Sequence, residues 1–255
     1  MRLKGKAAMV TGGGAGIGRG IVLALAREGA DVAVLDINRD AALKTAKEAE
    51  ALGGILALAV EADVASLASV NGAVEKVLGQ FGKIDVLVNN AGISPKRQGV
   101  KVPVVEMDPA EWERVIAVNL SGAFLCSRAV LPGMMERKYG KIINMASVAG
   151  KTGGFAGGAH YASSKAGIIG LTKAIALESA KYGINVNAIM PSRIRTDMGF
   201  SIPEAKLQER LAQIPLGRLG TTDDVAEAVL FLACDQTSSW ITGTTLNVSG
   251  GALMD

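Results

Sequence analysis

Residues 7–36 read AAMVTGGGAGIGRGIVLALAREGADVAVLD, and this stretch decides the fold. Its two short apolar runs, residues 7–11 and 31–36, predict buried strands, because strands covered on both faces are continuously apolar. Between them lie a glycine-rich turn and an amphipathic segment, residues 17–28, which predicts a helix. In a strand, glycine turn and helix of this kind, the N–H groups of the turn and of the helix N-terminus can hold a pyrophosphate. The stretch therefore predicts a dinucleotide site.

The glycine turn has the pattern T-G-x-x-x-G-x-G rather than G-x-G-x-x-G. Asp36 ends the second predicted strand, about 20 residues after the turn, where a dinucleotide fold places the carboxylate that binds the adenosine ribose. A carboxylate there repels a 2′-phosphate, and the next residues, Ile37 and Asn38, carry no positive charge. NAD is therefore favoured over NADP. A second role for Asp36, as the cap of a helix starting near Arg39, is compatible with the first.

Composition narrows the function classes. The chain has 255 residues, 49% of them hydrophobic and 20% charged, and a net charge of +3 from interspersed bases and acids. That balance argues against a nucleic-acid or membrane-surface protein. Cys126 and Cys234 stand alone and the sequence has a single His, so we expect no metal site and two buried thiols in a reducing compartment. The N-terminus has no signal-peptide core and no run approaches the ~18 apolar residues of a membrane span, so we expect a cytoplasmic protein.

The strand and helix pattern repeats along the chain. Further strands are expected over residues 55–61, 84–88, 141–147, 183–191 and 244–248, and helices over 40–52, 67–81, 110–137, a segment from 161 onward, 203–213 and 223–233. Alternating apolar strands and helices predict an α/β fold of the Rossmann type: one domain, residues 1–255, with a doubly wound, mostly parallel, seven-stranded sheet and helices on both faces. The loops of residues 93–109, 148–160 and 192–220 are expected to border the substrate.

Tyr161 and Lys165 are four residues apart in a segment with helical apolar spacing. That spacing puts the phenol and the ammonium on one face of a helix, one turn apart. A tyrosine with its ordinary pKa of about 10 is a poor base, and a nearby positive charge favours its ionised form. The pair is therefore a candidate for proton transfer.

Together these motifs make the whole chain resemble a typical short-chain dehydrogenase/reductase. The residues that carry the resemblance are Thr11, Gly12, Gly16, Gly18, Asp63, Asn89, Asn90, Ala91, Gly92, Asn119, Ser147, Tyr161, Lys165 and residues 187–196. The resemblance implies a catalytic tetrad: Ser147 binds the substrate oxygen, Tyr161 moves the proton, and Lys165 holds the nicotinamide ribose. Asn119 would lie at a helix distortion whose freed carbonyl binds a water; the alternative is local bonding within its helix.

The resemblance also implies the cofactor contacts and the assembly. We expect NAD to be held by Thr11, Gly12, Gly14, Gly16, Ile17, Gly18, Asp36, Ile37, Asp63, Val64, Asn90, Ala91, Gly92, Tyr161, Lys165, Pro191, Ile194 and Thr196. Members of the family are mostly homotetramers, so a homotetramer, or a homodimer, is expected. The chain departs from the family pattern in the Ser147–Tyr161 spacing, which is one residue longer, in Ser192 after Pro191, and in Ser249 before Gly250.

The leading hypothesis is an NAD-dependent dehydrogenase of a small-molecule secondary alcohol such as a sugar, polyol or hydroxy acid. A 3-oxoacyl-[acyl-carrier-protein] reductase shares every motif, but Asp36 disfavours the NADPH on which biosynthetic reduction generally draws. A non-catalytic dinucleotide sensor would have a broken tetrad. Several bases follow the ends of strands, and Arg193, assisted by Lys151 or Arg97, is expected to bind an anionic group of the substrate together with Ser147 at its reacting oxygen.

Overall fold

The computed structural model describes residues 1–154, 157–196, 208 and 211–254. The helix expected over residues 203–213 lies mostly outside the described residues. Strands are β1 Ala7–Thr11, β2 Asp31–Asp36, β3 Ala57–Glu61, β4 Val86–Asn89, β5 Gly140–Met145, β6 Ile184–Pro191 and β7 Thr245–Val248. Helices are α1 Gly16–Arg27, α2 Arg39–Glu50, α3 Leu67–Phe81, α4 Pro109–Ile116, α5 Gly122–Arg137, α6 Ala149–Thr152, α7 Ala159–Ser179, α9 Thr222–Ala233 and α10 Asp235–Ser238.

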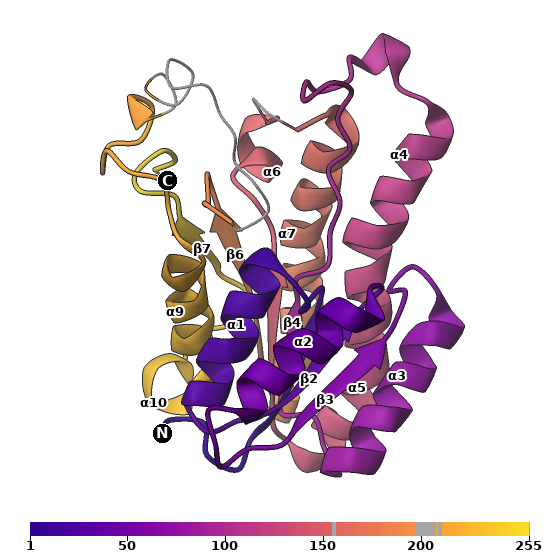
Figure 1. Ribbon diagram of the computed structural model, residues 1–255, viewed down its shortest axis with the longest axis vertical. Helices are drawn as coiled ribbons and strands as arrows, with labels where there is room; N and C mark the ends of the chain where they lie inside the picture. The colour runs from indigo at the N-terminus through magenta and orange to yellow at the C-terminus, as the bar shows by residue number, and fades with distance from the viewer. Residues whose placement is uncertain (155–156, 197–207, 209–210, 255) are drawn as a thin grey trace.

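The seven strands form one sheet in the order β3-β2-β1-β4-β5-β6-β7. Every neighbouring pair is parallel, so the sheet is wholly parallel where the sequence predicted a mostly parallel one. Helices α1, α2 and α9 cover one face, and α3, α5 and α7 cover the other (Figure 1). The predicted doubly wound α/β architecture is confirmed.

Side chains of the central strands alternate between two apolar clusters. Val10 and Val34 belong to the cluster under α1 and α9, whereas Met9 and Leu35 belong to the cluster under α3 and α5. All four are at most 2% exposed. Because successive side chains of a strand point to opposite faces, a strand covered on both sides must be apolar at every position. This is why residues 7–11 and 31–36 show no polar alternation.

The segment predicted as one helix over residues 110–137 is interrupted. A π-helical turn, Ala117–Ser121, separates α4 from α5. Among the described residues, Pro109–Arg137 is one helical stretch long and apolar enough by composition to cross a membrane, with a mean hydropathy of 1.5. It is a core helix of this fold, since side chains such as Cys126, Val130 and Met134 are buried against the sheet.

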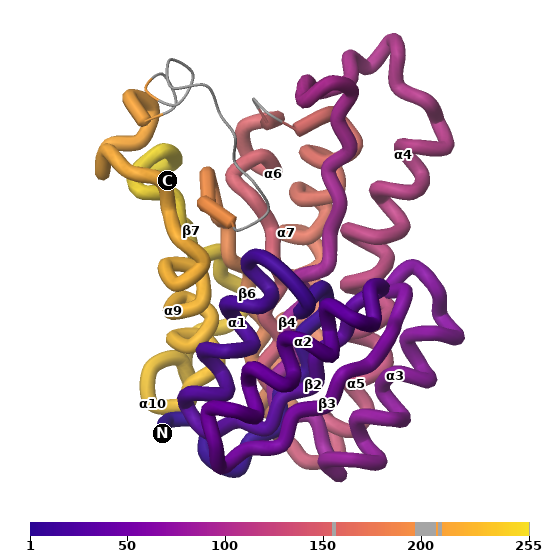
Figure 2. The backbone as a smooth tube through the Cα atoms, in the orientation of Figure 1, coloured from indigo at the N-terminus to yellow at the C-terminus, as the bar shows by residue number. Residues whose placement is uncertain are grey.

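Parallel strands bring the loops that follow them to one end of the sheet. The segments after β4 and β5 rise side by side at that end, next to α6 and α7 (Figure 2), and the Lys101 Nζ donates to the Gly154 carbonyl at 3.3 Å. Beneath them, the amide of Asn89 donates to Asn144, and the amide of Asn144 donates to the Thr172 hydroxyl on α7. This buried chain fixes α7 against the carboxyl ends of β4 and β5.

Candidate functional site

The glycine turn after β1 is shaped by close approach of the backbone. Gly12 and Gly16 have φ angles of +61° and +53°, a region that glycine occupies without strain. At Gly18, a Cβ atom would overlap the Gly12 carbonyl oxygen, and at Gly14 it would lie 2.9 Å from Asp36 Oδ2. The glycines therefore leave the backbone of the turn open, as a pyrophosphate requires.

The turn is tied to the end of β4 by side chains of both segments. The Thr11 hydroxyl accepts from the N–H groups of Asn90 and Ala91, each at 3.0 Å. The Asn90 amide donates to the carbonyl oxygens of Thr11 and Gly12, again at 3.0 Å. Asn90 and Ala91, predicted to contact the cofactor, thus also fix the shape of the turn.

Asp36 is held at the end of β2 by two backbone groups. Its Oδ2 accepts from Gly14 N–H and its Oδ1 from Asn38 N–H, both at 2.9 Å. A carboxylate has about four lone-pair sites, so both oxygens keep room for ribose hydroxyls. The cap of α2 is Asn38, whose Oδ1 accepts from Ala41 N–H; the second role suggested for Asp36 is therefore wrong. Ile37, 69% exposed, offers an apolar surface beside this carboxylate.

The other predicted adenosine contacts follow β3. Asp63 is exposed, and its Oδ1 accepts from Ala65 N–H at 2.9 Å. Val64 is buried against Gly122, where a Cβ atom would lie 2.8 Å from the valine side chain. The ends of β1, β2 and β3 thus present a glycine turn, the Asp36 carboxylate and the exposed Asp63 along one edge. These residues fit a dinucleotide such as NAD.

Ser147, Tyr161 and Lys165 come together beyond the end of β5. The Ser147 hydroxyl hydrogen-bonds the Tyr161 phenol and accepts from Ala149 N–H at 3.2 Å. The Lys165 Nζ lies 5.7 Å from the centroid of the Tyr161 ring and donates to the Met145 carbonyl at 2.6 Å. The structure thus gathers the hydroxyl, phenol and ammonium that a proton transfer to a substrate oxygen would use.

Burial controls the pKa values of this group. It raises the pKa of Tyr161, and the hydrogen bond from Ser147 lowers it only in part. It also lowers the pKa of Lys165 to about 8, because the residue is only 5% exposed and the loss of water disfavours its charged form. The sequence argument expected a nearby ammonium to favour the phenolate, and in this structure desolvation is the larger effect.

Asn119 lies in the π-helical turn and is 2% exposed. Its Oδ1 accepts from Ile93 N–H at 2.7 Å, and its Nδ2 donates to the Ile93 carbonyl at 3.0 Å and to the Ser164 hydroxyl at 3.1 Å. The helix distortion is present, and the alternative of side-chain bonding within its own helix is not. Gly92 lies beside this group, since a Cβ atom there would be 3.5 Å from the Lys165 Nζ.

The turn after β6 closes over the glycine turn. Ile194 forms a β-bridge with Gly220, and Arg195 N–H donates to the Gly220 carbonyl at 2.7 Å. A Cβ atom at Gly16 would lie 3.5 Å from the methyl carbon of Thr196. Of the residues predicted to contact the nicotinamide end of the cofactor, Thr196 thus lies near the turn predicted to hold the pyrophosphate, whereas Pro191 ends β6 and Ile194 pairs with Gly220.

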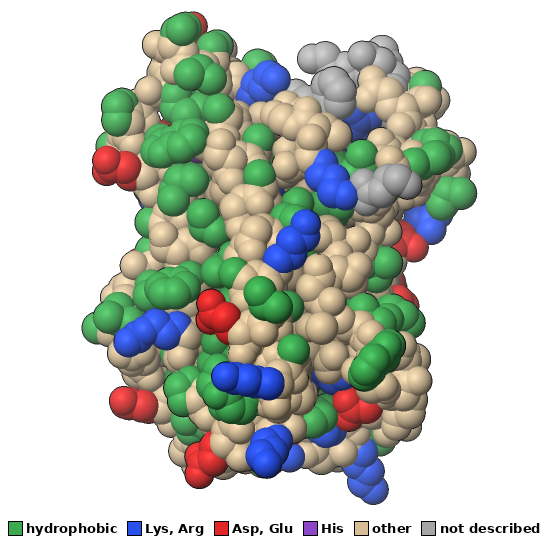
Figure 3. Space-filling model, turned by 180° about the vertical axis from the view of Figure 1, so that it is seen from behind, with side chains coloured by type: hydrophobic (Ala, Val, Ile, Leu, Met, Phe, Trp, Pro, Cys, Tyr) green, Lys and Arg blue, Asp and Glu red, His purple; other side chains and the backbone are tan. Residues whose placement is uncertain are grey.

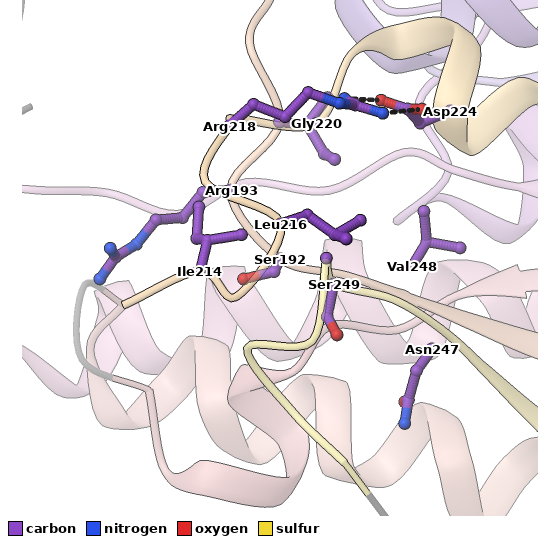
Figure 4. Close-up of a pocket in the computed structure, with 12 residues that line it drawn as sticks. Ser192, Arg193, Ile214, Leu216, Arg218, Gly220, Asp224, Asn247, Val248 and Ser249 are labelled. Atoms are coloured by element: carbon purple, nitrogen blue, oxygen red, sulfur yellow. Dashed lines mark hydrogen bonds and ion pairs between the residues drawn. The ribbon is translucent and has the colours of Figure 1, made fainter. Parts of the chain in front are cut away.

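The bases proposed for an anionic substrate have partners within the protein. Arg193 donates to the Gln213 side chain at 2.6 Å, and Figure 4 shows its guanidinium directed away from the other residues of a cavity of about 210 Å³. Arg97 donates to the Glu106 carbonyl within its own loop. Lys151 lies on α6, exposed. Of the described residues that line this cavity, none belongs to the tetrad, so an anion site stays a prediction.

Sequence reasoning missed three residues around Tyr161. His160, fully buried, accepts from Tyr161 N–H, Ser164 donates to the Tyr161 carbonyl, and Glu111 contacts the ring of His160. The only signal in the sequence was the position of a lone histidine next to the tyrosine. Within the described ranges, no three His, Cys, Asp or Glu side chains gather as a metal site would need.

Comparison with known proteins agrees with this geometry. The family model described as Enoyl-(Acyl carrier protein) reductase matches residues 12–252. A 3-oxoacyl-[acyl-carrier-protein] reductase, FabG, of Thermotoga maritima is 42% identical over 100% of both chains. The (2S)-[(R)-hydroxy(phenyl)methyl]succinyl-CoA dehydrogenase subunit BbsD of Thauera aromatica is 41% identical over 98% of both chains.

Comparison with solved structures also finds oxidoreductases. A 3-oxoacyl-[acyl-carrier protein] reductase of Brucella melitensis with bound NAD is 39% identical, with a TM-score of 0.91 over 100% of this chain and 95% of that one. Levodione reductase is 32% identical, with a TM-score of 0.91 over 98% of both chains. The chain therefore belongs to the short-chain dehydrogenase/reductase family and is an NAD(P)-dependent oxidoreductase acting on CH–OH groups.

Proposed function

We propose that this protein interconverts a 3-oxoacyl thioester and the corresponding 3-hydroxyacyl thioester with NAD(H). The observation that carries the proposal is the 42% identity, over the full length, to 3-oxoacyl-[acyl-carrier-protein] reductases. A relative of similar identity is named as a dehydrogenase of a hydroxylated acyl-CoA. These comparisons favour the second hypothesis of the sequence analysis over a sugar or polyol dehydrogenase. The thioester carrier, coenzyme A or a phosphopantetheine arm, is itself anionic, which matches the anionic substrate expected from the sequence.

The side chains at the end of β5 fit the chemistry of this reaction. The substrate oxygen would accept a hydrogen bond from Ser147, and Tyr161 would give its proton to that oxygen in reduction and take it back in oxidation. Lys165 would hold the nicotinamide ribose and add positive charge beside the phenol. When bound, the nicotinamide supplies or accepts the hydride. The ketone, NADH and one proton thus give the alcohol and NAD⁺.

NAD is the proposed cofactor because of Asp36. Its carboxylate is fixed by Gly14 and Asn38 at the place where a 2′-phosphate would have to sit, and like charges at that distance repel. A 3-oxoacyl-carrier-protein reductase of this fold has been seen with bound NAD. The alternative of a dinucleotide sensor is disfavoured, because Ser147, Tyr161 and Lys165 are all present and in contact range.

We also propose a cytoplasmic homotetramer, with a homodimer as the alternative. Large apolar side chains are exposed on several helices and after α10: Trp240 is 98% exposed, Leu177 84% and Phe124 47%. On the face shown in Figure 3, hydrophobic side chains gather along one side, while bases and acids are mixed elsewhere. Apolar exposure of this kind is typical of surfaces that bind another subunit.

Replacing Tyr161 with Phe tests the reaction. Turnover of a 3-oxoacyl-CoA with NADH should fall by about 10²–10⁴-fold, the contribution of a general acid, while NADH binding is nearly unchanged. Absorbance of the reduced cofactor measures the rate, and Tyr182→Phe is the control. A variant that keeps more than a tenth of wild-type kcat would remove Tyr161 from the reaction. If the wild type turned over sugars or polyols faster than thioesters, the proposed thioester substrate would be contradicted.

Replacing Asp36 with Ala tests the cofactor. The wild type should have a higher kcat/KM with NAD(H) than with NADP(H), and the variant should narrow this difference, since it loses both the ribose acceptor and the repulsion of the phosphate. Asp40→Ala, an exposed acid on the first turn of α2, is the matched control. A wild type that prefers NADP(H) would contradict the proposed role of Asp36.

Replacing Lys165 with Met tests the buried ammonium. Below pH 8 both the folded and the unfolded protein carry the proton on Lys165, and the folded state bears its full desolvation penalty, about 3 kcal/mol for this shift. Between pH 8 and 10.5 the folded state loses the proton first, so the stability of the wild type should rise relative to Lys165→Met. Urea unfolding between pH 8 and 10.5 measures the free energy of unfolding of the wild type and Lys165→Met, with the exposed Lys173→Met as control. If this free energy changes with pH in the same way for the wild type and Lys165→Met, the buried ammonium is refuted.

Trp240→Arg tests the assembly. Light scattering at micromolar concentration should give the mass of a tetramer or dimer for the wild type and a smaller mass for the variant, because a charge would then lie in an apolar contact. Far-UV circular dichroism would check that the fold is kept. A wild type that is monomeric at these concentrations would rule the assembly out.

A further inference from the structure

The backbone of Tyr161 is held on both sides by side chains of its own helix. Its N–H donates to the His160 Nδ1 at 2.6 Å, and its carbonyl accepts from the Ser164 hydroxyl at 2.8 Å. The N–H lies in the first turn of α7, where no backbone acceptor exists within the helix. The residue before the helix, Gly158, has no side chain to serve as a cap. His160 therefore satisfies a backbone donor of the reactive residue itself.

The ring of His160 is in turn fixed from outside α7. Its Nε2 lies 3.2 Å from Oε1 of Glu111 on α4, and the residue is fully buried. Gly158 packs against the edge of the ring, since a Cβ atom there would lie 2.8 Å from Cε1. Because Nδ1 accepts the Tyr161 N–H, the ring proton belongs on Nε2, where it can be donated to Glu111. Both ring nitrogens thus have a defined role.

We propose that His160, oriented by Glu111, is a positioning residue that fixes the first turn of α7 and so sets the Tyr161 phenol against Ser147. The proposal rests on the role of Tyr161 in the proposed function. A histidine kept only for packing would need neither partner, whereas here one nitrogen accepts and the other faces a carboxylate. An error of about 1 Å in the position of a reacting group can reduce a rate by about 10²-fold. The contact between His160 and the backbone of Tyr161 should therefore affect turnover strongly.

Two amide substitutions separate the two ring contacts. Asn can place an acceptor near the position of Nδ1, and Gln can place a donor near that of Nε2. His160→Gln and His160→Leu should lower kcat for the 3-oxoacyl-CoA by up to about 10²-fold while KM for NADH is unchanged, and His160→Asn should keep most of the activity. Full activity of the Leu variant, or equal loss in the Asn and Leu variants, would overturn the proposal.

A second variant moves the ring without removing it. Gly158→Ala should push the imidazole away from Tyr161 and lower kcat in the same way, although the φ of −69° at Gly158 suits alanine. Gly170→Ala is the matched control, because a Cβ atom at that position of α7 meets nothing within 4 Å. Wild-type kcat in the Gly158 variant would count against the proposal even if the His160 variants did not fold.

A spectroscopic measurement separates this proposal from the proposed function. His160 is the only histidine in the sequence, so protein labelled with ¹⁵N-histidine and free of a histidine tag gives a single pair of ring nitrogen signals. We expect an unprotonated Nδ1 and a protonated Nε2, and the Nε2 signal should shift in Glu111→Gln. A proton on Nδ1 would overturn the role of His160 whatever the enzyme reduces. Failure to turn over thioesters would overturn the proposed function and leave this result standing.

Discussion

The structure depends on the hydrogen bonds that join the ends of β1 and β4. These two strands are neighbours, but the chain leaves β1 toward one face of the sheet and leaves β4 toward the other. A crevice must open where the chain diverges, and ligands of such sheets bind there. Thr11 and Asn90 bridge the crevice floor with four hydrogen bonds of 3.0 Å, each between a side chain and the backbone. Together with the backbone pairing of β1 and β4, they fix the glycine turn relative to the segment that follows β4.

Helix α7 carries Tyr161 and Lys165, the proposed catalytic groups, and several hydrogen bonds attach this helix to its neighbours. Thr172 is bonded to Asn144 of β5, Ser164 to Asn119, and Lys165 to the Met145 carbonyl. The last of these holds a buried ammonium for which the described residues show no ion pair, and an apolar side chain at this position would avoid the cost of its desolvation. Stability and activity often conflict at functional sites, and the proposed role of Lys165 would account for such a cost.

The sequence predicted the fold well because its signals are local and repeated. The strands β1, β2 and β4 are short, mostly apolar runs, and the glycines of the turn act through the conformation of their own backbone. The tetrad and the cofactor segment were placed by spacing and by resemblance, and the structure brings those residues together. The helix distortion at Asn119 was expected, although only from the resemblance. Two features escaped prediction: the short helix α6 and the contacts of His160. The contact between His160 and Glu111 joins α7 to α4, segments far apart in the chain, and no local pattern encodes it.

The substrate was the weakest inference for the same reason. Arg193 and Arg97 follow strand ends, so the pattern put them near the site, but rotamers and neighbours decide where a long side chain points. Gln213 and Glu106 bind them in the structure. Asp36 shows the opposite case, because its backbone partners, Gly14 and Asn38, lie within the same βαβ unit or directly after it. Its orientation is therefore fixed by nearby chain, although the cap of α2 turned out to be Asn38.

The strand order has a consequence for synthesis on the ribosome. β1 is an interior strand, with β2 on one side and β4 on the other, and β4 begins only at Val86. A nascent chain that has released β1, β2 and β3 can pair those three, but one edge of β1 stays open until β4 emerges. Unpaired edges of apolar strands are sites of aggregation between chains. The nascent polypeptide thus has a vulnerable interval between the third and the fourth strand, and a chaperone that shields apolar edges would act in that interval.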